Sequence, residues 1–447
     1  MGTYVKYKDS GISWIGQIPD HWTVMRLKHA ARIVLGKMLC NNPPDNSLED
    51  YSLEKYLKSR NIGQLRLLAK EDDVEEMWFS ESEKQLYKLH KGDVVTNEGG
   101  DIGKVGLWNE NYDCYIQNSV HKITPKIGYD SRYIMYYINM AAGKDYFLSI
   151  VSQVSIAHLT KEKLSNTPFL APKFEEQKSI ADYLDSECKK IDVLIEKEGN
   201  RIELLKEARL SIVTKAVLQG LRSDVEMTPS KHVWLGSVPS HWTIMPLRYT
   251  ANAKGCCFID GDWIESKDID YGGSIKYLTT GNVGPGYYKE QGSGYITEDK
   301  FKELDCFDVL PGDLLISRLN EPIARTCIVP DLESRVVTAV DNVIFRPNPK
   351  ILDRKFACYY LNNGKLTEHA NIIARGATMH RISRTMLGHL PIVLPPLDEQ
   401  RDIVAFLDKE CAQYDTSIAR ANHQIDLLKE YKQSLITEVV TGKRKVC

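Results

Sequence analysis

Two long stretches of the chain carry apolar residues at a period of about 3.5 residues. Steps of four and three alternate along each stretch, with polar interruptions at Glu198 and Arg209 in the first and at Lys432 in the second. Such a narrow stripe is typical of a helix that pairs with another helix along one seam. The residues predicted to pair are Leu184, Cys188, Ile191, Ile195, Ile202, Leu205 and Ile212 in the first stretch, and Leu407, Cys411, Tyr414, Ile418, Ile425, Leu428 and Leu435 in the second.

The flanking residues predict where these helices begin and end. Prolines precede both stretches, and Gly220 and Gly442 stand just beyond the last periodic residues, where a C-terminal cap favours glycine. Each helix would span about 40 residues, or about 60 Å. Each helix could instead pack separately on its own neighbouring domain. Because helices of this length with so narrow a stripe are unusual in that role, we favour a pair formed within the chain.

The chain contains an internal duplication. WIGQIPDHWTVMRLK begins at Trp14 and WLGSVPSHWTIMPLR at Trp234, so the copies lie 234 − 14 = 220 residues apart. The helical stretches are 223 residues apart (399 − 176), and 17 of the 42 positions from Glu176 to Val217 are identical at that offset. Identity falls away between the GD motif that contains Gly92 and the YY motif that contains Tyr136. We expect the repeated parts to do one job twice and the divergent parts to recognise two different things.

This organisation predicts an α+β fold class: two pseudo-symmetric mixed α/β domains separated by an antiparallel two-helix coiled coil. The antiparallel direction follows from twofold pseudo-symmetry between the copies. Asp93–Thr96 and Leu314–Ser317 are predicted to be strands, and Tyr133–Met140 and Lys355–Asn362 helices. The predicted boundaries are 1–172 for the first domain, 173–220 for the first helix, 221–395 for a linker and the second domain, and 396–447 for the second helix.

Composition narrows the class of protein. The 447 residues are 43% hydrophobic and 26% charged, with no apolar run long enough to cross a membrane and no signal peptide, so we expect a cytoplasmic location. The ten cysteines form no CxxC pair and no zinc-type spacing, which predicts reduced thiols and no metal. The net charge of −2 argues against tight DNA binding by the chain alone, and fits a protein that reads bases while partners grip phosphates.

Motifs that resemble catalytic sites are incomplete. Asn42-Pro43-Pro44-Asp45 resembles an adenine methyltransferase motif, but an aspartate stands where an aromatic residue must stack on the flipped base. The stretch 99–104, GGDIGK, is one residue short of a phosphate-binding loop, and Val105 replaces the hydroxyl that binds magnesium. We therefore predict no catalytic residues.

Polar loops offer chemistry that can read bases. Arginine pairs with guanine and asparagine or glutamine with adenine in the major groove. The segment 371–391 contains three arginines and two histidines but no acidic residue. The candidate DNA-binding residues are Arg318, Asn320, Arg325, Arg375, His380, Arg381 and Arg384 in the second half, and Asn97, Glu98, Lys104, Gln117, Asn118, His121, Lys122, Gln153, His158 and Lys161 in the first. The alternative for any single residue is a solvated surface on which arginines pair with carboxylates.

Together these segments resemble the specificity subunits of type I restriction–modification enzymes. The resemblance lies in the repeated WIGQIPDHW and WLGSVPSHW, in KGDVV and PGDLL, and in GATMHRISRTMLGHLPIVLPPLDEQRDIVAFLD with its first-half counterpart VSIAHLTKEKLSNTPFLAPKFEEQKSIADYLD. It covers nearly the whole chain. The first copy departs at Ala157-His158 and at APKFEEQ, where the second has the fuller forms.

The resemblance implies two target-recognition domains, each of which reads half of a split DNA sequence in the major groove. The helix pair would fix the spacer between the half-sites and dock two methyltransferase subunits, and restriction (translocase) subunits would join the complex. S-adenosylmethionine, ATP and magnesium would belong to those partners, and this chain would bind no cofactor.

Two other classes of protein remain as alternatives. One is a coiled-coil scaffold whose two globular halves bind two protein partners. The other is an enzyme with a fused methyltransferase or nuclease, against which the length argues because the duplicated units already occupy both halves. Binding to duplex DNA that weakens with salt, and an assay of methyl transfer by the chain alone, would separate these alternatives.

Overall fold

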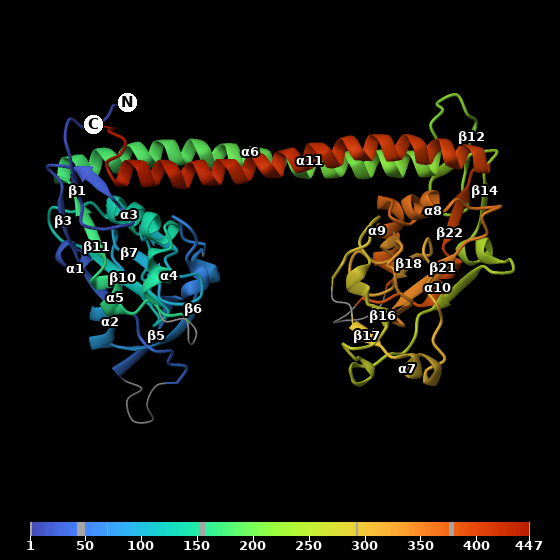
Figure 1. Ribbon diagram of the computed structural model, residues 1–447, viewed down its shortest axis with the longest axis horizontal. Helices are drawn as coiled ribbons and strands as arrows, with labels where there is room; N and C mark the ends of the chain where they lie inside the picture. The colour runs from blue at the N-terminus through green and yellow to red at the C-terminus, as the bar shows by residue number, and fades with distance from the viewer. Residues whose placement is uncertain are drawn as a thin grey trace. The chain divides into compact units, whose positions relative to one another are not determined.

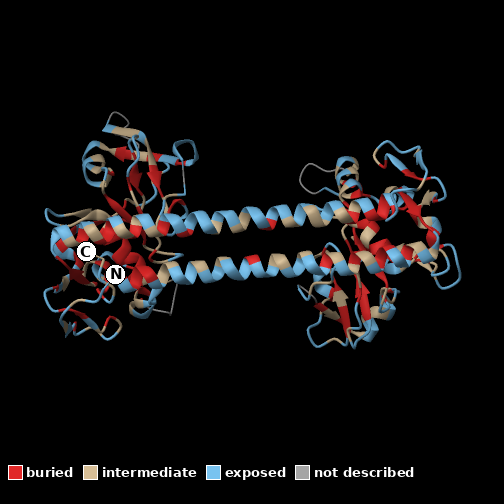
Figure 2. Ribbon diagram, turned by 90° about the horizontal axis from the view of Figure 1, so that it is seen from above, coloured by how far each residue is buried: buried red, intermediate tan, exposed pale blue. Residues whose placement is uncertain are grey.

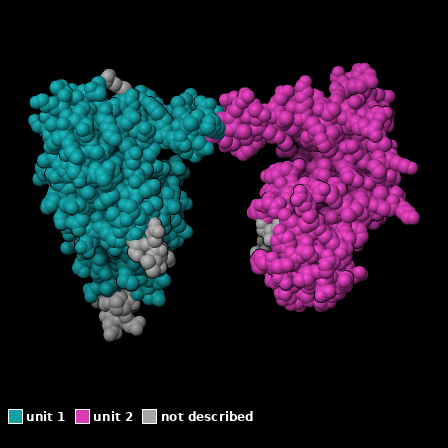
Figure 3. All heavy atoms as spheres, in the orientation of Figure 1, with its two compact units in different colours: residues 1–198, 423–447 teal, residues 199–422 magenta. Residues whose placement is uncertain are grey.

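The computed structural model describes residues 2–42, 50–68, 70–151, 157–291, 294–374 and 380–446. It divides into two compact units, shown in Figure 3. Unit 1 consists of Met1–Glu198 and His423–Cys447, and unit 2 of Gly199–Asn422. Each unit therefore contains one mixed α/β domain together with part of each long helix.

The two long helices are α6, Phe174–Gln219, of 46 residues, and α11, Leu397–Val440, of 44 residues (Figure 1). They pair within each unit. In unit 1, Cys188 and Ile191 share a hydrophobic core with Leu435. In unit 2, Val213 shares a core with Leu407 and Cys411. The predicted fold class is thereby confirmed, including the helix pair.

The predicted seam lies on the inner side of the helices. None of its residues is exposed: half are buried, and the rest, such as Leu205 and Tyr414, are partly covered. Apolar residues off the seam, such as Leu204 and Leu427, are exposed at 65% and 50%. Figure 2 shows the same alternation along both helices.

Two of the polar interruptions form ion pairs between the helices. In unit 2, Arg209 Nε lies 2.9 Å from Asp415 Oδ1, and in unit 1, Lys432 Nζ lies 2.7 Å from Asp192 Oδ1. The pairs are equivalent under the repeat, since 432 − 209 and 415 − 192 both equal 223. In each pair the two residue numbers sum to 624 (209 + 415 and 192 + 432), as an antiparallel register requires.

The α/β domain of unit 1 centres on a four-stranded antiparallel sheet in the order β4-β10-β7-β8. A smaller sheet, β6-β5-β9, and two-stranded pairs β1-β2 and β11-β3 complete it. Its strands are β1 (Tyr7–Asp9), β2 (Gln17–Pro19), β3 (Thr23–Arg26), β4 (Ala31–Leu35), β5 (Tyr51–Leu57), β6 (Glu75–Ser80), β7 (Val94–Asn97), β8 (Val105–Leu107), β9 (Tyr115–Ile116), β10 (Val120–Pro125) and β11 (Pro168–Ala171). Its α-helices besides the long pair are α1 (Leu27–Ala30), α2 (Glu81–Tyr87), α3 (Ser131–Gly143), α4 (Tyr146–Ile150) and α5 (Lys161–Ser165).

Unit 2 repeats this plan with the four-stranded sheet β15-β21-β18-β19, the smaller sheet β17-β16-β20 and the pairs β12-β13 and β14-β22. Its strands are β12 (Met227–Pro229), β13 (Ser237–Pro239), β14 (Thr243–Pro246), β15 (Cys257–Asp260), β16 (Ile275–Leu278), β17 (Gly294–Ile296), β18 (Leu314–Ser317), β19 (Thr326–Ile328), β20 (Val336–Thr338), β21 (Asn342–Arg346) and β22 (Pro391–Leu394). Its α-helices besides the long pair are α7 (Glu298–Glu303), α8 (Arg354–Leu361), α9 (Gly364–Ile373) and α10 (Arg384–His389). The strands and helices expected near residues 94, 314, 133 and 355 are therefore present.

A repeated glutamine holds each α/β domain on its long helix. Buried Gln400 accepts a hydrogen bond from the Asp353 N–H (2.8 Å) and donates to the Ile351 and Pro395 carbonyls (2.9 and 2.8 Å). Gln177 repeats this in unit 1, with the Asp130 N–H and the Pro172 carbonyl. Asp130 and Asp353 are the N-caps of α3 and α8. The duplicated glutamine thus links the start of each long helix to the helix that packs beside it.

The neighbouring glutamate is the acceptor for the repeated His-Trp motif. In unit 1, Glu176 accepts hydrogen bonds from the indole of Trp22 (3.1 Å) and contacts the imidazole of His21 (3.0 Å). In unit 2, Glu399 does the same for Trp242 (3.0 Å) and His241 (2.9 Å). These contacts give a structural reason why HW and EQ both occur in each half of the chain.

The substitution Gln400→Ala should lower the free energy of unfolding of unit 2 by about 1–3 kcal/mol, because two backbone carbonyls and one N–H lose their hydrogen bonds to this side chain. Urea unfolding followed by far-ultraviolet circular dichroism measures the change. Gln424→Ala is the matched control, since Gln424 lies exposed on the same helix. Equal unfolding midpoints for the two variants would contradict the docking role.

Each long helix is followed by a glycine in the left-handed region, as predicted. Gly220 has φ +77° and Gly442 has φ +71°. A Cβ on Gly442 would lie 2.3 Å from Pro19 Cδ. The residues after α11 therefore pack directly on the N-terminal hairpin of unit 1, which strands β1 and β2 form. The Gly2 and Lys445 backbones also pair there. The C-terminal segment therefore completes unit 1.

All nine cysteines in the described part of the chain are free. Within the described residues, no helix is both long and apolar enough to cross a membrane.

Candidate nucleic-acid interface

The loops that follow the central strands β7 and β18 rest on the same backbone frame in both units. In unit 1, the Glu98 N–H donates to the Ser119 carbonyl (2.9 Å), and the Leu159 N–H donates to the Glu98 carbonyl (2.7 Å). An antiparallel bridge joins Gly99 to His158. The stretch that ends at Leu159 is thereby fastened alongside the strand end.

Unit 2 repeats each of these bonds. The Arg318 N–H donates to the Asp341 carbonyl (2.8 Å), and the Ile382 N–H donates to the Arg318 carbonyl (3.0 Å). A bridge joins Leu319 to Arg381. The frame positions are therefore 98 and 318, 119 and 341, and 158 and 381, at offsets of 220, 222 and 223 (318 − 98, 341 − 119, 381 − 158). Every one of these positions carries a different residue in the two units.

In unit 1 the exposed group on this frame is an imidazole held by a carboxylate. His158 Nδ1 lies 2.8 Å from Glu98 Oε2. The histidine side chain is 51% exposed, whereas the glutamate side chain is 15% exposed. Because the carboxylate engages one ring nitrogen, the other remains available to a ligand.

In the described part of unit 2, two arginines and a histidine are exposed on this frame, and each has an acidic partner. Arg381 Nη2 lies 2.7 Å from Asp341 Oδ1, Arg384 Nε lies 3.6 Å from Asp260 Oδ2, and His380 Nδ1 lies 3.1 Å from Glu321 Oε1. The segment is free of acids in sequence, but loops and a strand end from elsewhere in the unit supply them. Among the described residues, the charges on this surface are therefore nearly balanced, while Arg381 and Arg384 keep 46% and 44% of their side chains exposed.

Several candidate residues instead lie inside the fold. His121 is fully buried, with Nε2 2.6 Å from the Leu159 carbonyl, and burial lowers its pKa. Lys122 donates to the Leu86 and Lys88 carbonyls, and burial lowers its pKa against the opposing effect of Asp93. Asn97 is 2% exposed. All three lie in strands of the central sheet, and their side chains are covered in this conformation.

Two arginines of unit 2 are likewise internal. Arg325 donates to five backbone carbonyls, those of Thr280, Val283, Leu319, Asn320 and Pro322. Arg318 is 5% exposed, donates to the Val340 carbonyl and lies 3.2 Å from Asp260. Burial lowers the pKa of both guanidinium groups, and nearby Asp260 opposes this for Arg318. They hold the loops around the exposed arginines in place.

The remaining candidates are spread over the neighbouring loops. Lys104 forms an ion pair with Asp101, and Gln117 donates to Asn118 (2.6 Å). Lys161 is exposed at the start of α5, and Asn320 is exposed with φ +60°. Gln153 and Arg375 lie outside the described residues, as does most of the Asn42–Asp45 motif.

The sequence patterns did not single out Asp341 and Asp260. Each stands far along the chain from the arginine that it contacts, so local composition gives no sign of the pair. The signal that could have identified Asp341 is the duplication, since it occupies the frame position of Ser119.

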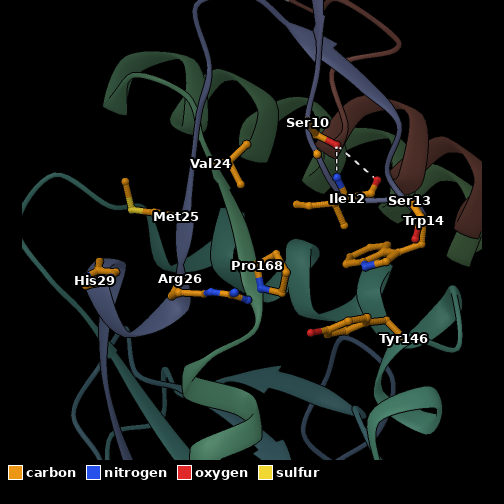
Figure 4. Close-up of a pocket in the computed structure, with 11 residues that line it drawn as sticks. Ser10, Ile12, Ser13, Trp14, Val24, Met25, Arg26, His29, Tyr146 and Pro168 are labelled. Atoms are coloured by element: carbon orange, nitrogen blue, oxygen red, sulfur yellow. Dashed lines mark hydrogen bonds between the residues drawn. The ribbon is translucent and has the colours of Figure 1, made fainter.

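A surface hollow in unit 1 belongs to the framework. Figure 4 shows Trp14 and Tyr146 facing each other at its edge, with rings 4.7 Å apart and nearly parallel. Arg26 lies in the same hollow and donates to the Asn166 carbonyl (2.8 Å). Trp234 makes the equivalent stack on His369 in unit 2, at 4.9 Å. The repeated tryptophan therefore anchors the N-terminal loop of each domain.

Among the described residues, no group of three or more His, Cys, Asp or Glu side chains is placed so that it could hold a metal ion.

Comparison with known proteins agrees with this duplicated architecture. The family model for the type I restriction modification DNA specificity domain matches twice, at residues 19–204 and 251–426. These matches cover most of the chain, so the chain belongs to this family: it is a specificity subunit of a type I restriction–modification system, a non-catalytic component.

Individual relatives match along nearly their full length. The specificity subunit of the type I restriction enzyme MjaVIII from Methanocaldococcus jannaschii is 22% identical over 96% of this chain and 94% of its own length. The putative MjaX specificity subunit of the same organism is 23% identical over 97% and 96%. A chain in a solved structure of a type I R-M system has a TM-score of 0.67 at 16% identity and covers 95% of this chain and 98% of its own length, which shows a shared fold. The scaffold alternative is not supported by these comparisons.

Proposed function

We propose that this chain reads a two-part DNA sequence, one part with each unit, for a type I restriction–modification complex. One observation carries the proposal: the two units present different side chains, Glu98 and His158 against Asp341 and Arg381, on the same hydrogen-bonded frame. A shared frame with different polar groups is what two readers of unlike half-sites require, because base edges are distinguished by hydrogen-bond pattern.

The long helices would set the spacer between the half-sites. Half-sites on one face of B-DNA lie about 34–36 Å apart or a multiple of it, a span that helices of about 40 residues can bridge. The antiparallel register, fixed in each unit by an ion pair and a shared core, supports a stiff connection.

The same helices would dock two methyltransferase subunits, and restriction subunits would complete the complex. S-adenosylmethionine, ATP and magnesium would then be bound by those partners. Nonspecific affinity for DNA depends on a surplus of positive charge. Because acidic residues offset the exposed Arg381, Arg384 and His380, the partner subunits would supply most of the contacts to phosphates.

Expression of this chain with its cognate methyltransferase subunit, in cells that lack other adenine methylation, tests the proposal. Single-molecule sequencing should then find methylated adenine in one gapped motif, and find none when this chain is omitted. Methylation of an ungapped motif, or the same motif without this chain, would overturn the proposed function.

A further inference from the structure

The frame described above points to one particular base-reading position in each unit. At positions 158 and 381, a side chain that is about half exposed is held by a carboxylate that is more covered. The contact distances are 2.8 Å and 2.7 Å. Resting on the proposed function, we infer that Arg381 reads a guanine, that His158 reads one base of the other half-site, and that Asp341 and Glu98 are positioning residues.

The two units reach this arrangement by different routes. In unit 1 the acid, Glu98, comes from the end of the central strand, and the second loop contributes Ser119. In unit 2 the strand end carries Arg318, and the acid, Asp341, comes from the second loop. If these residues served only the backbone frame, the acid would not need to move from the strand end in unit 1 to the second loop in unit 2. The exchange keeps an acid beside the exposed side chain although the exposed residue differs.

The chemistry of each exposed side chain limits what it can read. A guanidinium with one nitrogen held by Asp341 keeps further N–H donors, and two of them match O6 and N7 of guanine. The carboxylate also fixes the rotamer before DNA arrives, which lowers the entropy lost on binding. An imidazole held through Nδ1 offers only Nε2, so His158 makes one hydrogen bond and discriminates less strongly.

In unit 2, the buried Arg318 holds the loop that positions Asp341 beside Arg381. It is buried beside Asp260 and donates to the Val340 carbonyl, next to Asp341 in the chain. Its own backbone N–H also binds the Asp341 carbonyl. These contacts hold the loop that carries Asp341, so the acid itself is fixed in place.

Methylation profiling of the complex, with Arg381→Ala and Asp341→Asn in the otherwise complete chain, tests the inference. Arg381→Ala should relax the requirement for guanine at one base pair of one half-site by about tenfold or more, with the other half-site unchanged. Asp341→Asn should relax the same base pair to a smaller degree. The double variant should be no more relaxed than Arg381→Ala alone, because the acid acts through the arginine.

Two further variants keep the test decisive. Asp341→Ser introduces the residue that the frame already accepts at Ser119, and serves if Asp341→Asn fails to fold. Arg335→Ala is the matched control, since Arg335 is 40% exposed and paired with Asp308 elsewhere in unit 2, and it should leave the motif unchanged.

The outcomes separate this inference from the proposed function. A gapped motif in the wild-type complex that persists unaltered in Arg381→Ala and Asp341→Asn would overturn the inference alone. Relaxation at different base pairs in these two variants would overturn the positioning role of Asp341. Absence of any gapped motif with the wild-type chain would overturn the proposed function.

Discussion

A seven-residue insertion into each long helix should abolish methylation of the wild-type target. The insertions belong after Asn200 in α6 and after His423 in α11, because these positions obey the same residue-number sum of 624 as the ion pair within each unit (200 + 424 and 201 + 423). A whole heptad in both helices preserves the seam. It lengthens the helix pair by about 10.5 Å, the equivalent of about three base pairs.

Methylation profiling of the complex measures the result. Any remaining activity should fall on the same two half-sites with a changed gap. Gly199→Ala is the control at the same place, because a Cβ there meets nothing within 4 Å and alanine favours the helix. Unchanged methylation of the wild-type gap by the insertion variant would show that the helices do not set the spacer.

Gly442→Ala should destabilise unit 1 by about 2–4 kcal/mol. The residue adopts φ +71°, which disfavours any side chain, and its new Cβ would lie 2.3 Å from Pro19 Cδ and 3.1 Å from the indole of Trp22. The N-terminal hairpin must therefore move away from the end of α11. Thermal unfolding of the purified chain should show a lower transition temperature for unit 1.

Gly11→Ala separates the two causes. Gly11 has φ +70°, almost the same as Gly442, but a Cβ there meets nothing within 4 Å. This control should cost only the backbone term, about 1 kcal/mol. Equal losses in the two variants would mean that the contact between the C-terminal turn and the hairpin contributes nothing to stability.

The long helices could be predicted because their signal is local and repeated. A 3.5-residue period and a C-terminal glycine each arise within a few neighbouring positions. The cross-helix partners of Arg209 and Lys432 are more than 200 residues away, so sequence spacing marked them only as interruptions. The duplication compensates in part, because it supplies the twofold relation that sets the direction of pairing.

The candidate DNA-binding residues were harder to predict, because polarity does not reveal which way a strand residue points. His121 and Lys122 look equally suited to bind DNA, but both occupy β10, where neighbouring strands and loops cover them. Arg325 looks like an exposed cation and instead organises five carbonyls. In contrast, His158 and Arg381 leave the frame at its edge and remain accessible.

The composition of the two units affects the order in which they can fold. Unit 2 is one continuous segment, Gly199–Asn422, whereas unit 1 joins Met1–Glu198 to the later segment His423–Cys447. Although its α/β domain is synthesised first, unit 1 lacks Leu435 and Val439, which share its core, until the whole of unit 2 has been synthesised. Unit 2 can therefore fold on the ribosome while the N-terminal half still exposes an apolar surface. A message truncated before codon 423 would yield a complete second reader attached to an unfinished first one.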